Sequence, residues 1–135
     1  MNHFLNIKSI KDLNKTVQDA LALKANPYAY SSLGTQKTLV LLFFNASLRT
    51  RISTELAAKN LGMSVIVLNV NDAWQLEFEE GAVMDLQSSE HIKEAAQVIS
   101  QYATIIGVRA FPTLTDKVKD QSEWVLNAFA AYASV

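Results

Sequence analysis

The chain contains no cysteine, so it can form neither a disulfide bond nor a thiolate metal site. It has no block of basic residues, and its formal charge of −1 gives no indication of nucleic-acid binding. Its longest apolar run, residues 39–44, is far shorter than the roughly 20 residues that span a bilayer. The first ten residues lack the basic start and apolar stretch of a signal peptide. These absences predict a soluble, cytoplasmic protein.

The 135 residues, half of them apolar, are enough for one domain with a buried core. Three short apolar runs predict buried strands, at residues 38–44, 64–70 and 103–108. Helical spacing predicts helices from about residue 10 to Pro27, from the turn after Phe44 to Leu61, from Ser88 or Ser89 onward, and over residues 120–131. Gly62 is expected to be a left-handed helix cap. The alternation predicts a three-layer α/β domain with a central parallel sheet flanked by helices.

The last residues, AYASV, are apolar and prone to form a strand. They are therefore expected to begin a further strand at Val135. We interpret residues 1–135 as one domain of a longer protein.

The segment FFNASLRTRIS leaves the first predicted strand without a glycine or proline in the turn, although turns are usually rich in those residues. In an open parallel sheet, ligands bind beyond the carboxyl ends of the strands, where both Ser47–Arg51 and Arg109 are expected to lie. A helix that begins here offers unpaired N–H groups and a positive dipole to an anion. The Ser47 and Thr50 hydroxyls and the Arg49 guanidinium add donors suited to phosphate oxygens. The residues thus predict an anion-binding turn, although the glycines and lysine of a P-loop are absent.

A purely structural reading of the same turn is equally open at this point. Ser47 could simply cap the helix, because serine is a common cap, while Arg49 and Arg51 face solvent. Arg51 in particular could have a structural role, since alternate positions on a helix point in different directions.

The segment FFNASLRTR resembles the phosphate-binding signature F-x-x-x-S-x-R-T-R of the aspartate/ornithine carbamoyltransferase family. Downstream, NDAWQLEFEEGAVMD, EHIKEAAQVIS and GVRAFP resemble the N-acetylornithine and N-succinylornithine carbamoyltransferases. Asn45, Leu48 and the tryptophan loop favour this acylornithine branch, because other branches usually have threonine at the position of Leu48. The resemblance runs through essentially the whole chain and implies a carbamoyl phosphate-binding domain.

The resemblance also implies a set of site residues. It assigns Ser47, Leu48, Arg49 and Thr50 to carbamoyl phosphate, with Leu48 contributing mainly its backbone. Arg109 would reach the same ligand from the next strand end, which makes Arg49 and Arg109 the catalytic candidates. Trp74 would contribute to carbamoyl phosphate binding in a neighbouring subunit of a homotrimer; its alternative role is that of a half-buried loop anchor.

Other polar residues are expected to have ordinary roles. His3 and His91 match no catalytic histidine of the family, and His91 is expected in the first turn of its helix. Glu77, Glu79 and Glu80 are expected to form a solvated acidic loop, because no histidine or further carboxylate at ligand spacing supports a metal site. No metal and no cofactor are predicted.

The implied reaction is attack by the δ-amino group of an N-acylornithine on the carbamoyl carbon of carbamoyl phosphate, in arginine biosynthesis. The family's histidine-proline-x-glutamine motif and its second, acylornithine-binding domain would lie beyond Val135. The chain is therefore expected to supply the carbamoyl phosphate-binding half of an active site and to be inactive alone. The acyl preference is expected to depend on residues near Ser88 and Ser89. Ordinary ornithine carbamoyltransferase and a non-catalytic anion- or nucleotide-binding module remain the alternatives.

Overall fold

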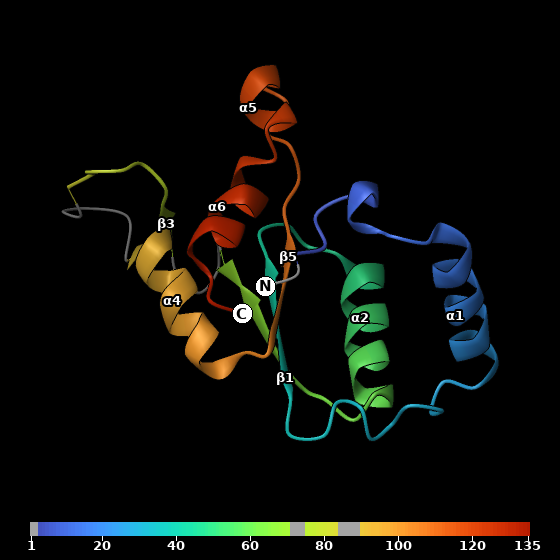
Figure 1. Ribbon diagram of the computed structural model, residues 1–135. Helices are drawn as coiled ribbons and strands as arrows, with labels where there is room; N and C mark the ends of the chain where they lie inside the picture. The colour runs from blue at the N-terminus through green and yellow to red at the C-terminus, as the bar shows by residue number, and fades with distance from the viewer. Residues whose placement is uncertain (1–2, 71–74, 84–89) are drawn as a thin grey trace.

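The computed structural model describes residues 3–70, 75–83 and 90–135, and it confirms the predicted α/β architecture. Three parallel strands form the central sheet in the order β2-β1-β5 (Figure 1). These strands are β1 (Thr38–Phe43), β2 (Ser64–Asn69) and β5 (Ile105–Arg109). The helices are η1 (Ile7–Ser9), α1 (Leu13–Ala25), α2 (Leu48–Asn60), α4 (Ile92–Tyr102), α5 (Lys117–Gln121) and α6 (Trp124–Tyr132). All three predicted strands are present within a residue or two of their expected bounds.

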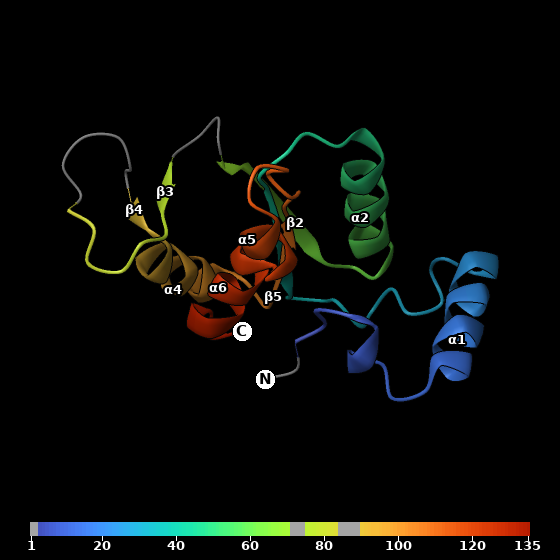
Figure 2. The ribbon, with the colours of Figure 1, turned by 90° about the horizontal axis from the view of Figure 1, so that it is seen from above.

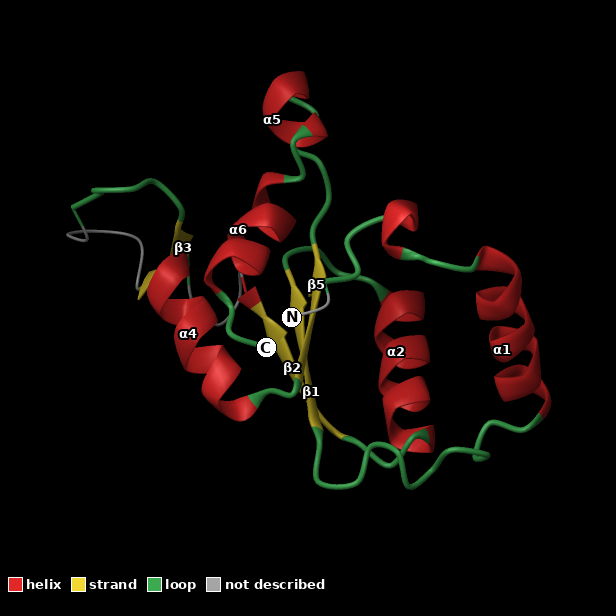
Figure 3. Ribbon diagram, in the orientation of Figure 1, coloured by secondary structure: helices red, strands yellow, loops and turns green. Residues whose placement is uncertain are grey.

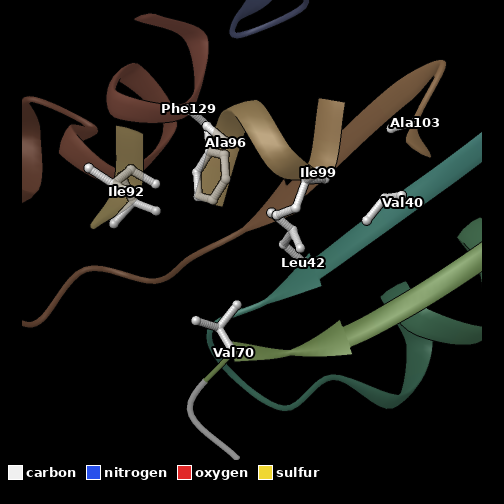
Figure 4. Close-up of a cluster of buried hydrophobic side chains, with 9 residues drawn as sticks. Val40, Leu42, Val70, Ile92, Ala96, Ile99, Ala103 and Phe129 are labelled. Carbon is white, nitrogen blue, oxygen red and sulfur yellow. The ribbon is translucent and has the colours of Figure 1, made fainter. Parts of the chain in front are cut away.

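Helices cover both faces of the sheet, with α2 on one side and α4 and α6 on the other (Figures 2 and 3). The central strand β1 alternates between them, as the period of two in a strand requires. Val40 and Leu42 point into the larger core cluster, which is drawn in Figure 4 and comprises Val40, Leu42, Val70, Ile92, Ala96, Ile99, Ala103, Val125 and Phe129. The odd-numbered residues of β1 pack with Ala58 of α2 in a smaller cluster, which comprises Leu39, Leu41, Phe43 and Ala58. The sheet is therefore buried on both faces along β1.

The end of α2 is fixed by Gly62, which has a φ of +83°. A Cβ at this position would lie 2.1 Å from the carbonyl oxygen of Ser31. Both the left-handed backbone and the close approach require glycine. The predicted cap is confirmed.

The segment before α4 differs from the prediction. The helix begins at Ile92, and its N-cap is His91, whose Nδ1 accepts a hydrogen bond from Lys93 N at 3.2 Å. Ser88 and Ser89, where the helix was expected to begin, lie outside the described residues. A short parallel pair of strands that was not predicted, β3 (Leu76–Glu77) and β4 (Glu90–His91), precedes α4. The inward face of α4 is as predicted, because Ile92, Ala95, Ala96 and Ile99 are all buried.

The predicted helix over residues 120–131 is in fact two helices. The break falls at Ser122 and Glu123, and Glu123 has a φ of +50°. Since a left-handed residue cannot continue a right-handed helix, α5 ends here and α6 starts in a new direction. Val125 and Phe129 of α6 are buried as expected.

The apolar stripe of α1 is not buried in this chain. The helix is present, capped by Asp12, but it has no buried residue. Leu13, Val17 and Leu21 each expose about half of their surface. On α2, Ile52 and Leu56 are exposed to a similar degree. Helical spacing thus predicted these helices correctly, although their apolar faces remain open.

An aromatic cluster joins the end of β1 to β3 and α6. Phe44 lies 6.2 Å from Phe78 and 6.1 Å from Phe129, measured between ring centroids. Phe78 in turn meets Trp124 edge to face at 4.5 Å. Such contacts add to the energy of apolar burial. They hold the residue that follows β1 against the α6 side of the domain.

The chain end does not form the expected strand. Helix α6 continues to Tyr132, and residues 133–135 are irregular. Ser134 N donates to the buried Ser100 Oγ at 3.0 Å, and that hydroxyl donates to Ala96 O at 2.7 Å.

Among the described residues, no helix is long and apolar enough to cross a membrane.

Candidate anion-binding site

The predicted site residues meet at the carboxyl edge of the sheet. Phe43, at the end of β1, pairs with Asn69 of β2 and Arg109 of β5. The contact with β5 continues one residue further, because Phe44 N donates to Arg109 O at 2.9 Å. The chain then turns into α2 above these strand ends. This edge is where open parallel sheets place their ligands.

Ser47 is the N-cap of α2. Its backbone is extended, with a φ of −157°, and its Oγ accepts a hydrogen bond from Thr50 N at 3.3 Å. The capping role that the structural reading proposed is therefore present. It does not compete with anion binding at the remaining first-turn N–H groups, which have no partner within a helix.

Arg109 comes to the same turn from β5. Its Nη1 donates to Asn45 O at 2.6 Å and to Ala46 O at 3.0 Å. Its guanidinium carbon lies 4.0 Å from the centroid of the Phe111 ring. The predicted meeting of Arg109 with the Ser47 turn is thus found in the structure, and the hydrogen bonds show that Arg109 holds the turn's backbone.

The two arginines of the turn have different surroundings. Arg51 donates from Nε to Glu55 Oε1 at 3.2 Å and from Nη1 to Asn69 Oδ1 at 3.3 Å. Among the residues that the structure describes, the exposed Arg49 side chain forms no hydrogen bond and no ion pair. Arg51 is therefore occupied by the protein, in agreement with the structural role considered for it, whereas Arg49 is available to a ligand.

A crevice of about 460 Å³ opens beside the start of α2, on the β2 side. Its lining residues are Phe43, Phe44, Asn45, Ala46, Ser47, Leu48, Arg51 and Asn69. Arg49, Thr50 and Arg109 are not among them, so the crevice and the candidate anion ligands share Ser47 and Leu48. Sequence reasoning missed Asn69; the signal was a polar residue that ends a buried strand at the ligand-binding edge.

Several other predicted residues are placed differently or not described. Trp74 lies outside the described residues. Glu77 is half-buried in β3, and its carboxylate accepts from Phe78 N at 2.7 Å and from Glu79 N at 2.9 Å. Glu80 accepts from Tyr132 Oη at 3.1 Å, which raises the pKa of the Tyr132 phenol. The prediction of a solvated acidic loop is therefore confirmed for Glu79 and Glu80, which are exposed, and wrong for Glu77, which is half-buried. No group of three potential metal ligands occurs within residues 3–70, 75–83 and 90–135.

The loop after β5 is ordered by Asp120. Its carboxylate accepts hydrogen bonds from Thr113 N at 2.7 Å, Thr113 Oγ1 at 3.0 Å and Leu114 N at 2.8 Å. The Thr113 backbone donor is the largest cause that lowers the pKa of this carboxyl below its ordinary value. Asp120 thereby holds the segment that follows Arg109.

Fold and site together define an α/β domain with an arginine-rich turn at the carboxyl edge of a parallel sheet. The description "Aspartate/ornithine carbamoyltransferase, carbamoyl-P binding domain" matches residues 2–134. The chain belongs to this family, as its carbamoyl phosphate-binding domain.

Individual relatives agree with that assignment. The chain is 44% identical to N-succinylornithine carbamoyltransferase of Bacteroides thetaiotaomicron over 134 residues, which cover 98% of this chain and 42% of the relative. It is 45% identical to N-acetylornithine carbamoyltransferase of Xylella fastidiosa over 138 residues, covering 100% of this chain and 40% of the relative. It matches a solved N-acetyl-L-ornithine transcarbamylase variant, complexed with carbamyl phosphate and N-succinyl-L-norvaline, with a TM-score of 0.90. That match has 43% identity and covers all of this chain but 41% of the solved one. The chain thus spans about two fifths of the length of these relatives.

Proposed function

We propose that the chain is the carbamoyl phosphate-binding half of an enzyme that transfers a carbamoyl group to the δ-amino group of an N-acylornithine, in arginine biosynthesis. The observation that carries the proposal is the convergence of the α2 N-terminus and Arg109 on one turn at the carboxyl edge of the sheet. The acylornithine branch is supported by the two relatives of about 45% identity, both of which act on acylornithines by name.

In this proposal, the phosphate group binds at the start of α2. The Ser47 hydroxyl, the N–H groups of Leu48 and Arg49, and the Thr50 hydroxyl surround one side of the anion, and the Arg49 guanidinium supplies paired donors. Their positive charge stabilises the phosphate as it leaves. Because Arg49 has no protein partner among the described residues, it can turn to the anion without breaking an existing contact.

Arg109 has a second task. One of its nitrogens, Nη1, holds the backbone of the turn, while the planar guanidinium retains donors on Nε and Nη2. We assign these donors to an oxygen of carbamoyl phosphate. Attack by the amine also requires its close positioning beside the carbamoyl carbon, which we assign to a second domain of the complete protein. Trp74 is assigned to the carbamoyl phosphate site of a neighbouring subunit in a homotrimer.

The test is a comparison of amine acceptors with the complete protein that contains this chain. Ornithine, N-acetylornithine and N-succinylornithine are supplied at equal concentration with carbamoyl phosphate, and the carbamoylated products are measured. We expect transfer to at least one acylornithine at a kcat/KM at least tenfold above that for ornithine. Preference for ornithine would identify an ordinary ornithine carbamoyltransferase, and no transfer to any of the three would contradict the proposal. The 135-residue chain alone is expected to be inactive and serves as the control.

A further inference from the structure

The turn before α2 and the loop after β5 are tied together in both directions. Arg109, the last residue of β5, donates from its side chain to the backbone carbonyls of residues 45 and 46. Asn45 returns the contact, because its Oδ1 accepts from Phe111 N at 2.7 Å. Each side chain thus holds the other segment's backbone. These contacts join residues 63 to 66 positions apart in the sequence.

The orientation of the Asn45 amide follows from its partner. A backbone N–H can only donate, so the side-chain oxygen must face Phe111 N, and the NH₂ group points away from it. A hydrophobic residue of similar size could not accept this hydrogen bond. The amide oxygen is therefore the feature of Asn45 that the loop requires.

The partner of Asn45 also contacts Arg109. The Phe111 ring lies under the Arg109 guanidinium, 4.0 Å from its carbon, as in a cation–π contact. Fixing the backbone of Phe111 consequently fixes the surface on which the guanidinium rests. The two Nη1 hydrogen bonds then set its position relative to the start of α2.

We propose that Asn45 is a positioning residue, which sets the Arg109 guanidinium in place for anion binding through Phe111. The inference rests on the proposed function for the identity of the anion, but the hydrogen bonds that link Asn45, Phe111 and Arg109 do not depend on it. Asn45 acts through another residue and need not touch the ligand. This role would explain why the turn has an asparagine at position 45, two positions before Ser47, and not a small residue such as the neighbouring Ala46.

The test uses three variants of the 135-residue chain. Asn45→Ala removes the acceptor. Asn45→Asp keeps an acceptor oxygen and should restore the tie, although its charge opposes an anion. Asn127→Ala is the matched control, because Asn127 also makes a side-chain hydrogen bond to a backbone atom, to Ser122 O at 2.6 Å, but on α6. Circular dichroism confirms that each variant is folded.

Two signals report the tie in the absence of any anion: hydrogen exchange of the Phe111 amide and the NMR resonance of Arg109 Nε–H. In Asn45→Ala we expect exchange at Phe111 to accelerate at least tenfold and the Arg109 signal to shift. Asn45→Asp should return exchange to within about threefold of the parent rate, and Asn127→Ala should change neither signal. Unchanged Phe111 and Arg109 signals in Asn45→Ala would overturn the inference.

Titration with carbamoyl phosphate then tests the consequence. Asn45→Ala should bind roughly 3- to 10-fold more weakly than the parent chain, the change expected for one lost hydrogen bond. Equal affinity despite a displaced Arg109 signal would overturn the positioning role. If the parent chain fails to bind carbamoyl phosphate, the proposed function of this domain fails. In that case the Arg109 signal in Asn45→Ala still decides whether Asn45 positions the guanidinium.

Discussion

Replacing Arg49 by alanine should weaken phosphate binding strongly while leaving the unliganded chain as stable as before. Within the described part of the chain, the Arg49 side chain makes no hydrogen bond and no ion pair, so its removal deletes no internal polar interaction. Hydrogen bonds to a charged group contribute about 1.5–3 kcal/mol, which corresponds to a roughly 10- to 150-fold weaker affinity. The loss should therefore appear only when an anion is present.

The size of the effect follows from mass action. At a phosphate concentration about 100 times the dissociation constant, a bound anion stabilises the parent chain by about 2.7 kcal/mol. If Arg49→Ala weakens binding about 100-fold, the same concentration stabilises it by only about 0.4 kcal/mol. For a domain of this size, these free energies correspond to rises of roughly 10 °C and 1–2 °C in melting temperature.

The assay is a thermal melt of the 135-residue chain across an inorganic phosphate series. Sulfate and chloride at matched ionic strength separate specific binding from screening. Lys59→Ala is the matched control: it removes the same charge from the last turn of α2, where Lys59 Nζ lies 3.7 Å from Glu55 Oε2. Arg49→Lys should recover part of the response, because it restores the charge without the planar fork. A phosphate response in Arg49→Ala equal to that of the parent would refute the role assigned to Arg49.

Three further outcomes are expected. Gly62→Ala should lower the free energy of unfolding by about 3 kcal/mol, because it adds backbone strain and a clash. Gly81 also has a positive φ but faces open space, so Gly81→Ala should lower it by only about 1 kcal/mol. Equal denaturation midpoints of the two variants would contradict this expectation. Because the pKa of Asp120 is lowered in the folded state, its hydrogen bonds stabilise the fold above the unfolded-state pKa near 3.8, and this stability is lost as pH falls through the folded-state pKa. NMR should therefore show the Thr113 and Leu114 amides losing their hydrogen bonds below about pH 4, and Asp120→Asn should abolish this pH-dependent step. In the complete protein, mixing Trp74→Ala with Arg49→Ala subunits should restore some activity if sites are shared between subunits, and no recovery after confirmed exchange would count against a shared site.

The sequence was sufficient to predict the central strands and the covering helices, because burial leaves a periodic pattern. Strand β1 is apolar throughout since both its faces are covered, and α4 repeats apolar residues at helical spacing. Gly62 was predictable because few other residues adopt its backbone conformation. These features depend on neighbours in the sequence.

The features that could not be predicted depend on contacts between distant residues or on very short elements. Strands β3 and β4 have two residues each, too few to show a period. The left-handed Glu123 divides a segment whose apolar spacing looks continuous. For α1, the apolar spacing identified one face, but spacing cannot reveal whether the covering partner belongs to the same chain.

The candidate site was predicted in part. Ser47 and Arg109 converge because parallel strands place their carboxyl ends together, a rule that needs only the strand assignment. The mutual contacts of Asn45 and Arg109 span more than 60 residues and leave no periodic signal. The hydrogen bond between Arg51 and Asn69 likewise could not be predicted without knowing that β1 pairs with β2.

The aromatic cluster gives the domain an optical reporter. The sequence has two tryptophans, so Trp74→Phe leaves Trp124 as the sole indole fluorophore. Its ring meets Phe78 of the segment after β3 at 4.5 Å, and Lys119 Nζ lies 4.3 Å from its centroid on the other helix, α5. Phe78 in turn contacts Phe44, which directly precedes the turn before α2. The emission of Trp124 therefore records, in real time and without an added dye, whether α5, α6 and the β3 segment remain packed beside that turn.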